Sequence, residues 1–170
     1  MSVVDVDPAP ASWRPPTTGE RLAIIRAARS VAIVGMSASS HRASHFVATY
    51  LLSSSTDYDV YFVNPKGGEA FGRPFHPSLD ALPVVPDIVD VFRRADDLPA
   101  VAEEAIAVGA PVLWFQLGLR HDGAAQRANA AGLKVVQDRC LKIEHARFRG
   151  GLHLAGFDTG VITSRRHGVL

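Results

Sequence analysis

The stretch VAIVGMSASSHRAS, residues 31–44, sets a short apolar run against a glycine and a group of small polar residues. The run Val31–Val34 is rich in β-branched residues, which favours a buried strand. Gly35 ends this run, and apolar residues at helical spacing begin again at Ala43. A strand, a glycine turn and a helix in succession predict the first unit of a parallel sheet, with the turn open to a ligand.

The same rhythm repeats along the chain. Further apolar runs lie at 60–63, 88–92, 112–115 and 133–136. A helix is expected over 18–29, where Thr17 and Glu20 have capping-box spacing, and another from Ala43 to Leu51. A third helix is expected from a cap at Asp96 or Asp97 to a stop at Gly109, and a fourth over 123–131 after a cap at Asp122. Short apolar strands that alternate with helices predict an α/β fold: a doubly wound parallel sheet of five strands or slightly more, with helices on both faces.

Composition and length narrow the classes of protein. The chain has 170 residues, 47% of them hydrophobic and 21% charged, which is typical of one soluble globular domain. Its net charge of +1 provides no overall field for nucleic acid or for an anionic membrane surface. A single cysteine, Cys140, excludes an internal disulfide and suits a cytoplasmic location. No apolar run approaches the ~20 residues of a membrane span.

The expected organisation has three parts. Residues 1–16 contain four prolines and little pattern, which predicts a flexible leader. The ligand-binding domain is expected over 17–148. Residues 149–170 depart from the strand and helix rhythm and are expected to form a C-terminal extension that packs on the domain or extends it.

Ligands of open α/β sheets bind outside the carboxyl ends of the strands. The residues that follow the five expected strands, with those just beyond them, include Gly35, Met36, Ser37, Ala38, Ser39 and Arg42, then Asn64, Pro65 and Lys66, then Arg93 and Arg94, then Gln116 and Gly118, and last Cys140. Each glycine alone could be only a turn, and each arginine alone only a surface charge. Their convergence at one edge predicts a phosphate site.

Motifs that are absent from the chain narrow the range of phosphate compounds that could bind. The dinucleotide fingerprint G-x-G-x-x-G is absent, and so is the G-x-x-x-x-G-K-[ST] loop. Where an NAD site places an acid after the second strand, this chain has Asn64, Pro65 and Lys66. A lysine there favours a ribose that carries a phosphate. The residues therefore leave two ligands open, NADP and coenzyme A (CoA).

Three segments together resemble a known family. They are VNPK at 63–66, VDVFRR at 89–94 and DRCLKIEH at 138–145. Over roughly 20–148 the chain resembles the small stand-alone CoA-binding proteins, which are similar to the CoA-binding domain of the succinyl-CoA synthetase alpha subunit. This resemblance implies a Rossmann-like sheet that binds CoA or an acyl-CoA at the strand ends, as a carrier, a sensor or a thiol-exchange partner.

The resemblance also implies places for the ligand. Residues 35–39 would face the pyrophosphate, and residues 64–66 the adenosine and its 3′-phosphate. Val91, Phe92 and Arg93 would line the next wall, with Gln116 and Gly118 near the pantetheine arm. The chain departs from the family pattern at Met36, where alanine or leucine is common, and near Ala43, where the family often has a proline.

An independent catalytic activity is not expected. A full synthetase needs a phosphorylated histidine, a nucleotide-grasp domain and a partner subunit, for which 170 residues leave no room. No histidine spacing indicates a metal site. Asp90, inside the third strand, is expected to be partly buried and paired with an arginine in a structural role. The alternative, an NADP-dependent oxidoreductase, needs a proton donor such as a Tyr–Lys pair, and none is found. The expected small-molecule partner is CoA. A second copy of the chain, bound through the tail 152–162, or an unknown protein is the possible protein partner.

Cys140 leaves two interpretations open. Arg139, Lys142 and His145 are near it in sequence, and cations lower the pKa of a thiol and make it reactive. A free cysteine is also often a small buried hydrophobe. If the thiol faces the ligand, it can form a mixed disulfide with CoA.

Overall fold

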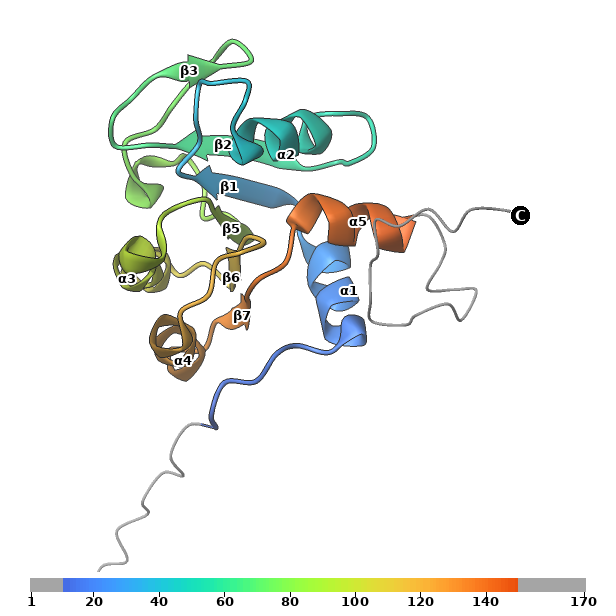
Figure 1. Ribbon diagram of the computed structural model, residues 1–170, viewed down its shortest axis with the longest axis vertical. Helices are drawn as coiled ribbons and strands as arrows, with labels where there is room; N and C mark the ends of the chain where they lie inside the picture. The colour runs from blue at the N-terminus through green and yellow to red at the C-terminus, as the bar shows by residue number, and fades with distance from the viewer. Residues whose placement is uncertain (1–10, 150–170) are drawn as a thin grey trace, which may run out of the picture.

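The computed structural model describes residues 11–149, and its centre is one sheet of five parallel strands (Figure 1). The strands are β1 (Ser30–Val34), β2 (Asp59–Val63), β5 (Ile88–Val91), β6 (Val112–Phe115) and β7 (Lys134–Val136). Their order across the sheet is β2-β1-β5-β6-β7. Each expected strand is therefore present, with its bounds shifted by at most one residue, and the predicted Rossmann-like, doubly wound fold is confirmed.

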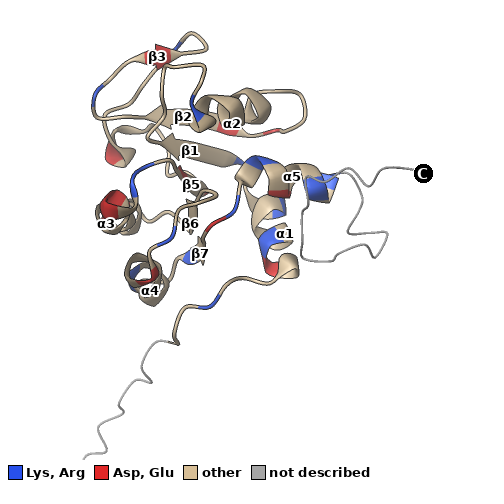
Figure 2. Ribbon diagram, in the orientation of Figure 1, with Lys and Arg blue, Asp and Glu red and all other residues tan. Residues whose placement is uncertain are grey.

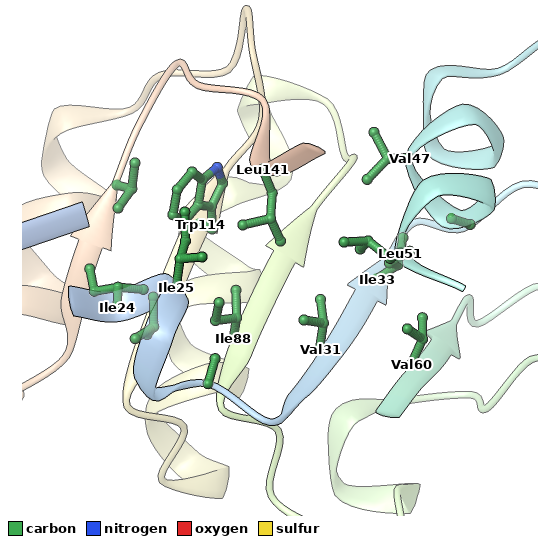
Figure 3. Close-up of a cluster of buried hydrophobic side chains, with 14 of the residues drawn as sticks. Ile24, Ile25, Val31, Ile33, Val47, Leu51, Val60, Ile88, Trp114 and Leu141 are labelled. Carbon is green, nitrogen blue, oxygen red and sulfur yellow. The ribbon is translucent and has the colours of Figure 1, made fainter. Parts of the chain in front are cut away.

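Helices cover both faces of the sheet (Figure 1). One face carries α1 (Thr18–Ala27), α2 (Ala43–Leu51) and α5 (Leu141–Arg149), and the other carries α3 (Leu98–Val108) and α4 (Asp122–Ala130). Alternate residues of each strand enter the two cores: Val31 and Ile33 belong to the first, and Ala32 to the second. Figure 3 shows the first core, where Trp114 and Leu141 lie among side chains of α1, α2 and β1.

Most of the expected helix ends are confirmed. Thr17 and Glu20 form the capping box of α1, and Gly109, at φ +75°, ends α3 in the left-handed conformation. The start of α4 differs. His121, and not Asp122, accepts the hydrogen bond from the backbone N–H of Ala124, at 3.0 Å. The side chain of Asp122 instead accepts hydrogen bonds from the side chains of Gln137 and Arg120, so the expected cap at Asp122 was wrong.

Several elements have no counterpart in the sequence prediction. The connection from β2 to β5 contains a short hairpin, β3 (Glu69–Ala70) and β4 (Arg73–Pro74), and the 3₁₀ turn η1 (Leu79–Ala81). A second 3₁₀ turn, η2 (Ala95–Asp97), precedes α3. The helix α5 was also not assigned, although it follows directly from the DRC segment. Of these elements, η2 and α5 each contribute one residue, Asp97 and Ile143, to the cleft at the edge where the strands end.

The structure differs from the expected flexible leader over residues 11–16. The backbone N–H of Trp13 donates to Gln126 of α4 at 2.5 Å, and its indole N–H donates to the carbonyl of Val135 in β7 at 3.0 Å. Because β7 is an edge strand, its outer groups need partners, and this segment covers them. Residues 1–10 and 150–170, with the expected dimer contact at 152–162, lie outside the described residues. Within residues 11–149, no helix is long and apolar enough to cross a membrane.

Candidate functional site

The sheet has its topological switch point between β1 and β5. The chain passes from β1 to β2 on one side and from β5 to β6 on the other, so the two connections leave neighbouring strand ends in opposite directions. Gly35 sits at this point with φ +86°, and a Cβ there would lie 2.3 Å from the carbonyl oxygen of Phe92. Only glycine therefore lets the two loops approach this closely.

Hydrogen bonds fix the loop after β1 to its neighbours. Asn64, after β2, donates from Nδ2 to the carbonyl of Met36 at 2.9 Å and accepts at Oδ1 from the backbone N–H of Lys66 at 3.0 Å. The backbone N–H of Ser37 donates to Oγ of Ser44 in α2 at 3.1 Å. The side chain of Asn64 thus holds the loops in place and has both of its polar atoms engaged within the protein.

A cleft of about 880 Å³ runs across the carboxyl ends of the strands. It is lined by Gly35, Ser37, Arg42, Ala43, Ser44, Val47, Asn64, Lys66, Phe92, Arg93, Arg94, Asp97, Gln116, Leu117, Leu119, Cys140 and Ile143. The residues come from the loops after all five strands and from α2 and α5, so distant parts of the sequence meet here.

The end of the cleft near β2, β1 and β5 is cationic. Arg42 precedes α2, Lys66 follows β2, and Arg93 and Arg94 follow β5; Figure 2 shows the positive segments at the start of α2 and before α3. Arg93 pairs with Asp97 at 3.3 Å. The side chains of the other three are exposed and make no ion pair within residues 11–149. This end of the cleft therefore offers three free positive charges to an anion.

The opposite end, near β6 and β7, is uncharged at its lining. Gln116, Leu117, Leu119, Cys140 and Ile143 form it. The side chains of Leu117 and Ile143 are exposed although they are large and apolar. The cleft is therefore polarised along its length, cationic at one end and apolar at the other.

Asp90, on the central strand β5, is completely buried and is bonded to Gln116 of the uncharged end. Its Oδ1 accepts a hydrogen bond from Nε2 of Gln116 at 2.6 Å, while its Oδ2 has no hydrogen-bond partner. Burial raises the pKa of Asp90 to about 8, against a smaller lowering by Gln116. The expected arginine partner was wrong: an amide holds this carboxyl, and burial keeps it mainly protonated at neutral pH.

Cys140 is half-buried at the floor of the uncharged end. Burial raises the pKa of its thiol and outweighs a lowering by a hydrogen bond with the backbone of Ile143. Two of the three cations expected to activate the thiol are occupied: Arg139 pairs with Glu144 at 3.2 Å, and His145 bonds to the hydroxyl of Tyr50 at 2.9 Å. The third, Lys142, lowers the pKa of the thiol, but burial outweighs it. The thiol is thus exposed to the cleft but is not activated by its neighbours.

The loop that carries Cys140 is held rigidly. The indole N–H of Trp114 donates to the carbonyl of Arg139 at 2.7 Å, and the buried Glu144 bridges Arg139 to Arg21 of α1, with Arg21 Nε at 3.0 Å. Asp138, at φ +55°, accepts from the backbone N–H of Gly118 at 2.7 Å. These bonds join the loops after β6 and β7 and fix the floor of the cleft.

Most of the site residues predicted from the sequence meet in this cleft. Those that line it are Gly35, Ser37, Arg42, Asn64, Lys66, Phe92, Arg93, Arg94, Gln116 and Cys140. Met36 and Val91 are completely buried in the two cores. Ala38, Ser39, Pro65 and Gly118 are exposed on the loops, outside the lining.

Sequence reasoning missed seven lining residues: Ala43, Ser44, Val47, Asp97, Leu117, Leu119 and Ile143. The first three follow the glycine loop at helical spacing, so the start of α2 could have been included. Ile143 lies on α5, for which no helix was expected. Among residues 11–149, no group of three or more histidine, cysteine or acidic side chains could hold a metal ion.

A doubly wound sheet with a cationic cleft at its switch point is the architecture of nucleotide-binding α/β domains. A family model described as a CoA binding domain matches residues 29–146. The chain belongs to this CoA-binding domain family, and the resemblance drawn from the sequence is confirmed.

Relatives of similar length support this assignment. The uncharacterized protein YneT of Bacillus subtilis (strain 168) is 37% identical over 131 residues, which cover 77% of this chain and 96% of YneT. The solved structure of Prb, the PH1109 protein redesigned for binding, is similar with a TM-score of 0.75 and 36% identity, over 79% of this chain and 94% of Prb. A hypothetical protein from Pyrococcus horikoshii OT3 is similar with a TM-score of 0.72 and 35% identity, over 81% and 97%.

Proposed function

We propose that this protein binds CoA or an acyl-CoA in the cleft across its strand ends. The observation that carries the proposal is the polarity of the cleft, with three cations that make no ion pair within residues 11–149 at one end and Cys140 among apolar side chains at the other. CoA has the matching chemistry: a triply phosphorylated nucleotide joined by an uncharged arm to a thiol. Membership of the CoA-binding domain family supports the same ligand.

The orientation of the ligand follows from this match. The 3′-phosphate and the adenosine lie by Lys66, and the pyrophosphate lies between the Gly35 loop and the start of α2, where backbone N–H groups and Arg42 favour an anion. The pantetheine arm then runs past Gln116 toward Cys140. The loops after β2 and β7 are about 19 Å apart, because four strand spacings of ~4.8 Å separate those strands. This separation suits a long ligand that lies across the whole sheet edge.

The site supports holding a ligand better than converting one. Asp90, the acid beneath the cleft, is held by Gln116 and has no nucleophile or base bonded to it within residues 11–149. We therefore propose a carrier or sensor of CoA, or a thiol-exchange partner at Cys140, in a reducing cytoplasm. No observation favours the NADP-dependent oxidoreductase that the residues alone left open.

Calorimetry tests the ligand with the full chain titrated by CoA, dephospho-CoA and NADP. We expect CoA to bind most tightly, dephospho-CoA more weakly because it lacks the 3′-phosphate, and NADP most weakly or not at all. Binding of NADP without binding of CoA would overturn the proposal. The absence of heat with any of the three compounds would overturn it as well.

A further inference from the structure

We propose that the cleft selects CoA compounds whose thiol end carries no negative charge, and that Gln116, held by Asp90, determines this selectivity. The ligands are then free CoA or a CoA thioester of a neutral acyl group, and thioesters of dicarboxylic acids are rejected. This inference rests on the proposed function, because it requires that the thiol end of CoA lie near Cys140.

The first observation is the distribution of charge along the lining. Every lysine and arginine that lines the cleft belongs to the loops after β1, β2 and β5. The residues from β6 onward that line it, from Gln116 to Ile143, include no cation. Arg139, the nearest cation in sequence to Cys140, is turned to Glu144 at 3.2 Å. No cation therefore lines this part of the cleft to pair with a carboxylate at the end of an acyl group; Lys142, whose charge acts on Cys140, is not among the lining residues.

The second observation is the orientation of Gln116, which is only 4% exposed. Its Nε2 donates to Asp90 at 2.6 Å, and its Oε1 has no hydrogen-bond partner within residues 11–149. The amide thus presents its acceptor atom to the ligand. A thiol or a pantetheine N–H can donate to Oε1, whereas an ionised carboxylate has only acceptors and cannot use this atom; the second N–H of Nε2 is the one donor of the amide that Asp90 leaves over.

The third observation is the position of Asp90 relative to the thiol. Asp90 is paired in register with Ile33 and Trp114, which belong to the core that Cys140 packs against. Trp114 in turn bonds to the carbonyl of Arg139, the residue before Cys140. A carboxylate at this end would approach a buried, uncharged carboxyl group in a region of low dielectric, where an unpaired charge is costly.

The test compares two acyl groups of equal carbon number, butyryl-CoA and succinyl-CoA, by calorimetry at pH 7 with free CoA alongside. We expect butyryl-CoA to bind about tenfold or more tightly than succinyl-CoA, because an unpaired carboxylate loses its hydration without replacement. Equal or tighter binding of succinyl-CoA would overturn the selectivity, and so would binding of free CoA alone, since the site would then take no acyl group. If free CoA also fails to bind, the proposed function itself is wrong.

Two pairs of variants test the cause. Leu117→Arg adds a cation at the exposed edge of the uncharged end, and we expect it to raise the affinity for succinyl-CoA by about fivefold or more over Leu117→Gln, the uncharged control.

Asp90→Val frees the Gln116 amide to turn its N–H groups toward the ligand, so discrimination against succinyl-CoA should shrink. Asp90→Asn keeps an acceptor for Gln116 and should restore the discrimination. If Asp90→Val and Asp90→Asn discriminate equally, Asp90 does not position Gln116.

Discussion

At the scale of single residues, Asp90 is a carboxylic acid kept uncharged inside an apolar sheet. Burial raises its pKa from 3.8 to about 8. Between these two values the folded chain retains a proton that the unfolded chain has released. The contribution of Asp90 to stability is therefore fully present below about pH 4 and decreases as the pH rises toward 8.

Asp90→Asn should remove this dependence. The free energy of unfolding of the wild type should fall, relative to that of the variant, by up to about 1.4 kcal/mol for each pH unit within the window. Urea unfolding of both proteins at pH 5, 6.5 and 8 measures the difference. Parallel curves for the two proteins across this range would show that Asp90 has an ordinary pKa.

Lys66 is the residue that we assign to the 3′-phosphate. A charge-assisted contact contributes about 1.5–3 kcal/mol, so Lys66→Ala should weaken CoA about tenfold or more. Dephospho-CoA should be affected much less. Lys134→Ala is the matched control, because Lys134 is exposed at the opposite end of the sheet, where β7 begins. Equal losses for CoA and dephospho-CoA would place the 3′-phosphate elsewhere.

Cys140 decides whether the site can also exchange thiols. Its thiolate would attack CoA disulfide, form the bond between Cys140 and one CoA, and release the other CoA as a thiolate. Because the pKa of this thiol is raised, we expect the reaction to be slow at pH 7 and to accelerate as the pH rises toward 9.

Intact mass after incubation with CoA disulfide measures this reaction. The wild type should gain the mass of one CoA, reductant should remove it, and Cys140→Ser should gain none. A wild type that binds CoA but never gains mass would leave Cys140 as a packing residue only.

At the scale of elements, the meeting of the β1 and β5 loops depends on Gly35. Alanine there would have to adopt φ +86° and would bring its Cβ to 2.3 Å from the Phe92 carbonyl. Gly109, which ends α3 at φ +75°, has open space around it. Gly35→Ala should therefore cost more stability than Gly109→Ala, which bears only the conformational cost of about 1–2 kcal/mol.

Thermal unfolding and CoA titration of both variants check this prediction. Gly35→Ala should also lose CoA binding, because its loop must move away from Phe92, whereas Gly109→Ala should keep it. Equal stability of the two variants would mean that the loops after β1 and β5 can move apart at no cost in free energy, which would contradict the prediction.

The elements also show how far the sequence alone could lead. The five strands were predictable because each is a short apolar run buried on both faces, and the capping box at Thr17 has a local signature. The cap at His121 was not predictable, because His121 and Asp122 are both placed to accept from the Ala124 N–H and the structure gives this bond to His121. The hairpin β3–β4 was not predictable either, because strands of two residues show no periodicity.

The candidate site was predictable to a similar degree. Residues directly after a strand, such as Lys66 and Arg93, follow from topology, because parallel strands end at one edge. The pairing of Asp90 with Gln116 could not be read from the sequence, because it depends on which neighbour in space reaches a buried carboxyl. Ile143 was missed for the same reason, as its place depends on how α5 packs beside the cleft.

At the scale of the whole molecule, a net charge of +1 coexists with a strongly cationic cleft end. Attraction of an anionic ligand is therefore local, and it should weaken as salt screens the exposed cations. A second cavity of about 380 Å³ lies at the other side of the fold, beneath the Trp13 segment, and is lined by α1 and β7. We assign the ligand to the first cavity and none to the second.

Hydrogen exchange of the wild-type chain, with and without saturating CoA, tests this assignment most directly. We predict slower exchange in the loops at 35–44, 64–68, 92–97, 116–119 and 138–143, which meet in the cleft, and unchanged exchange at 11–16. Slower exchange at 11–16 and in the first turns of α1, with no change in the five loops, would contradict the account.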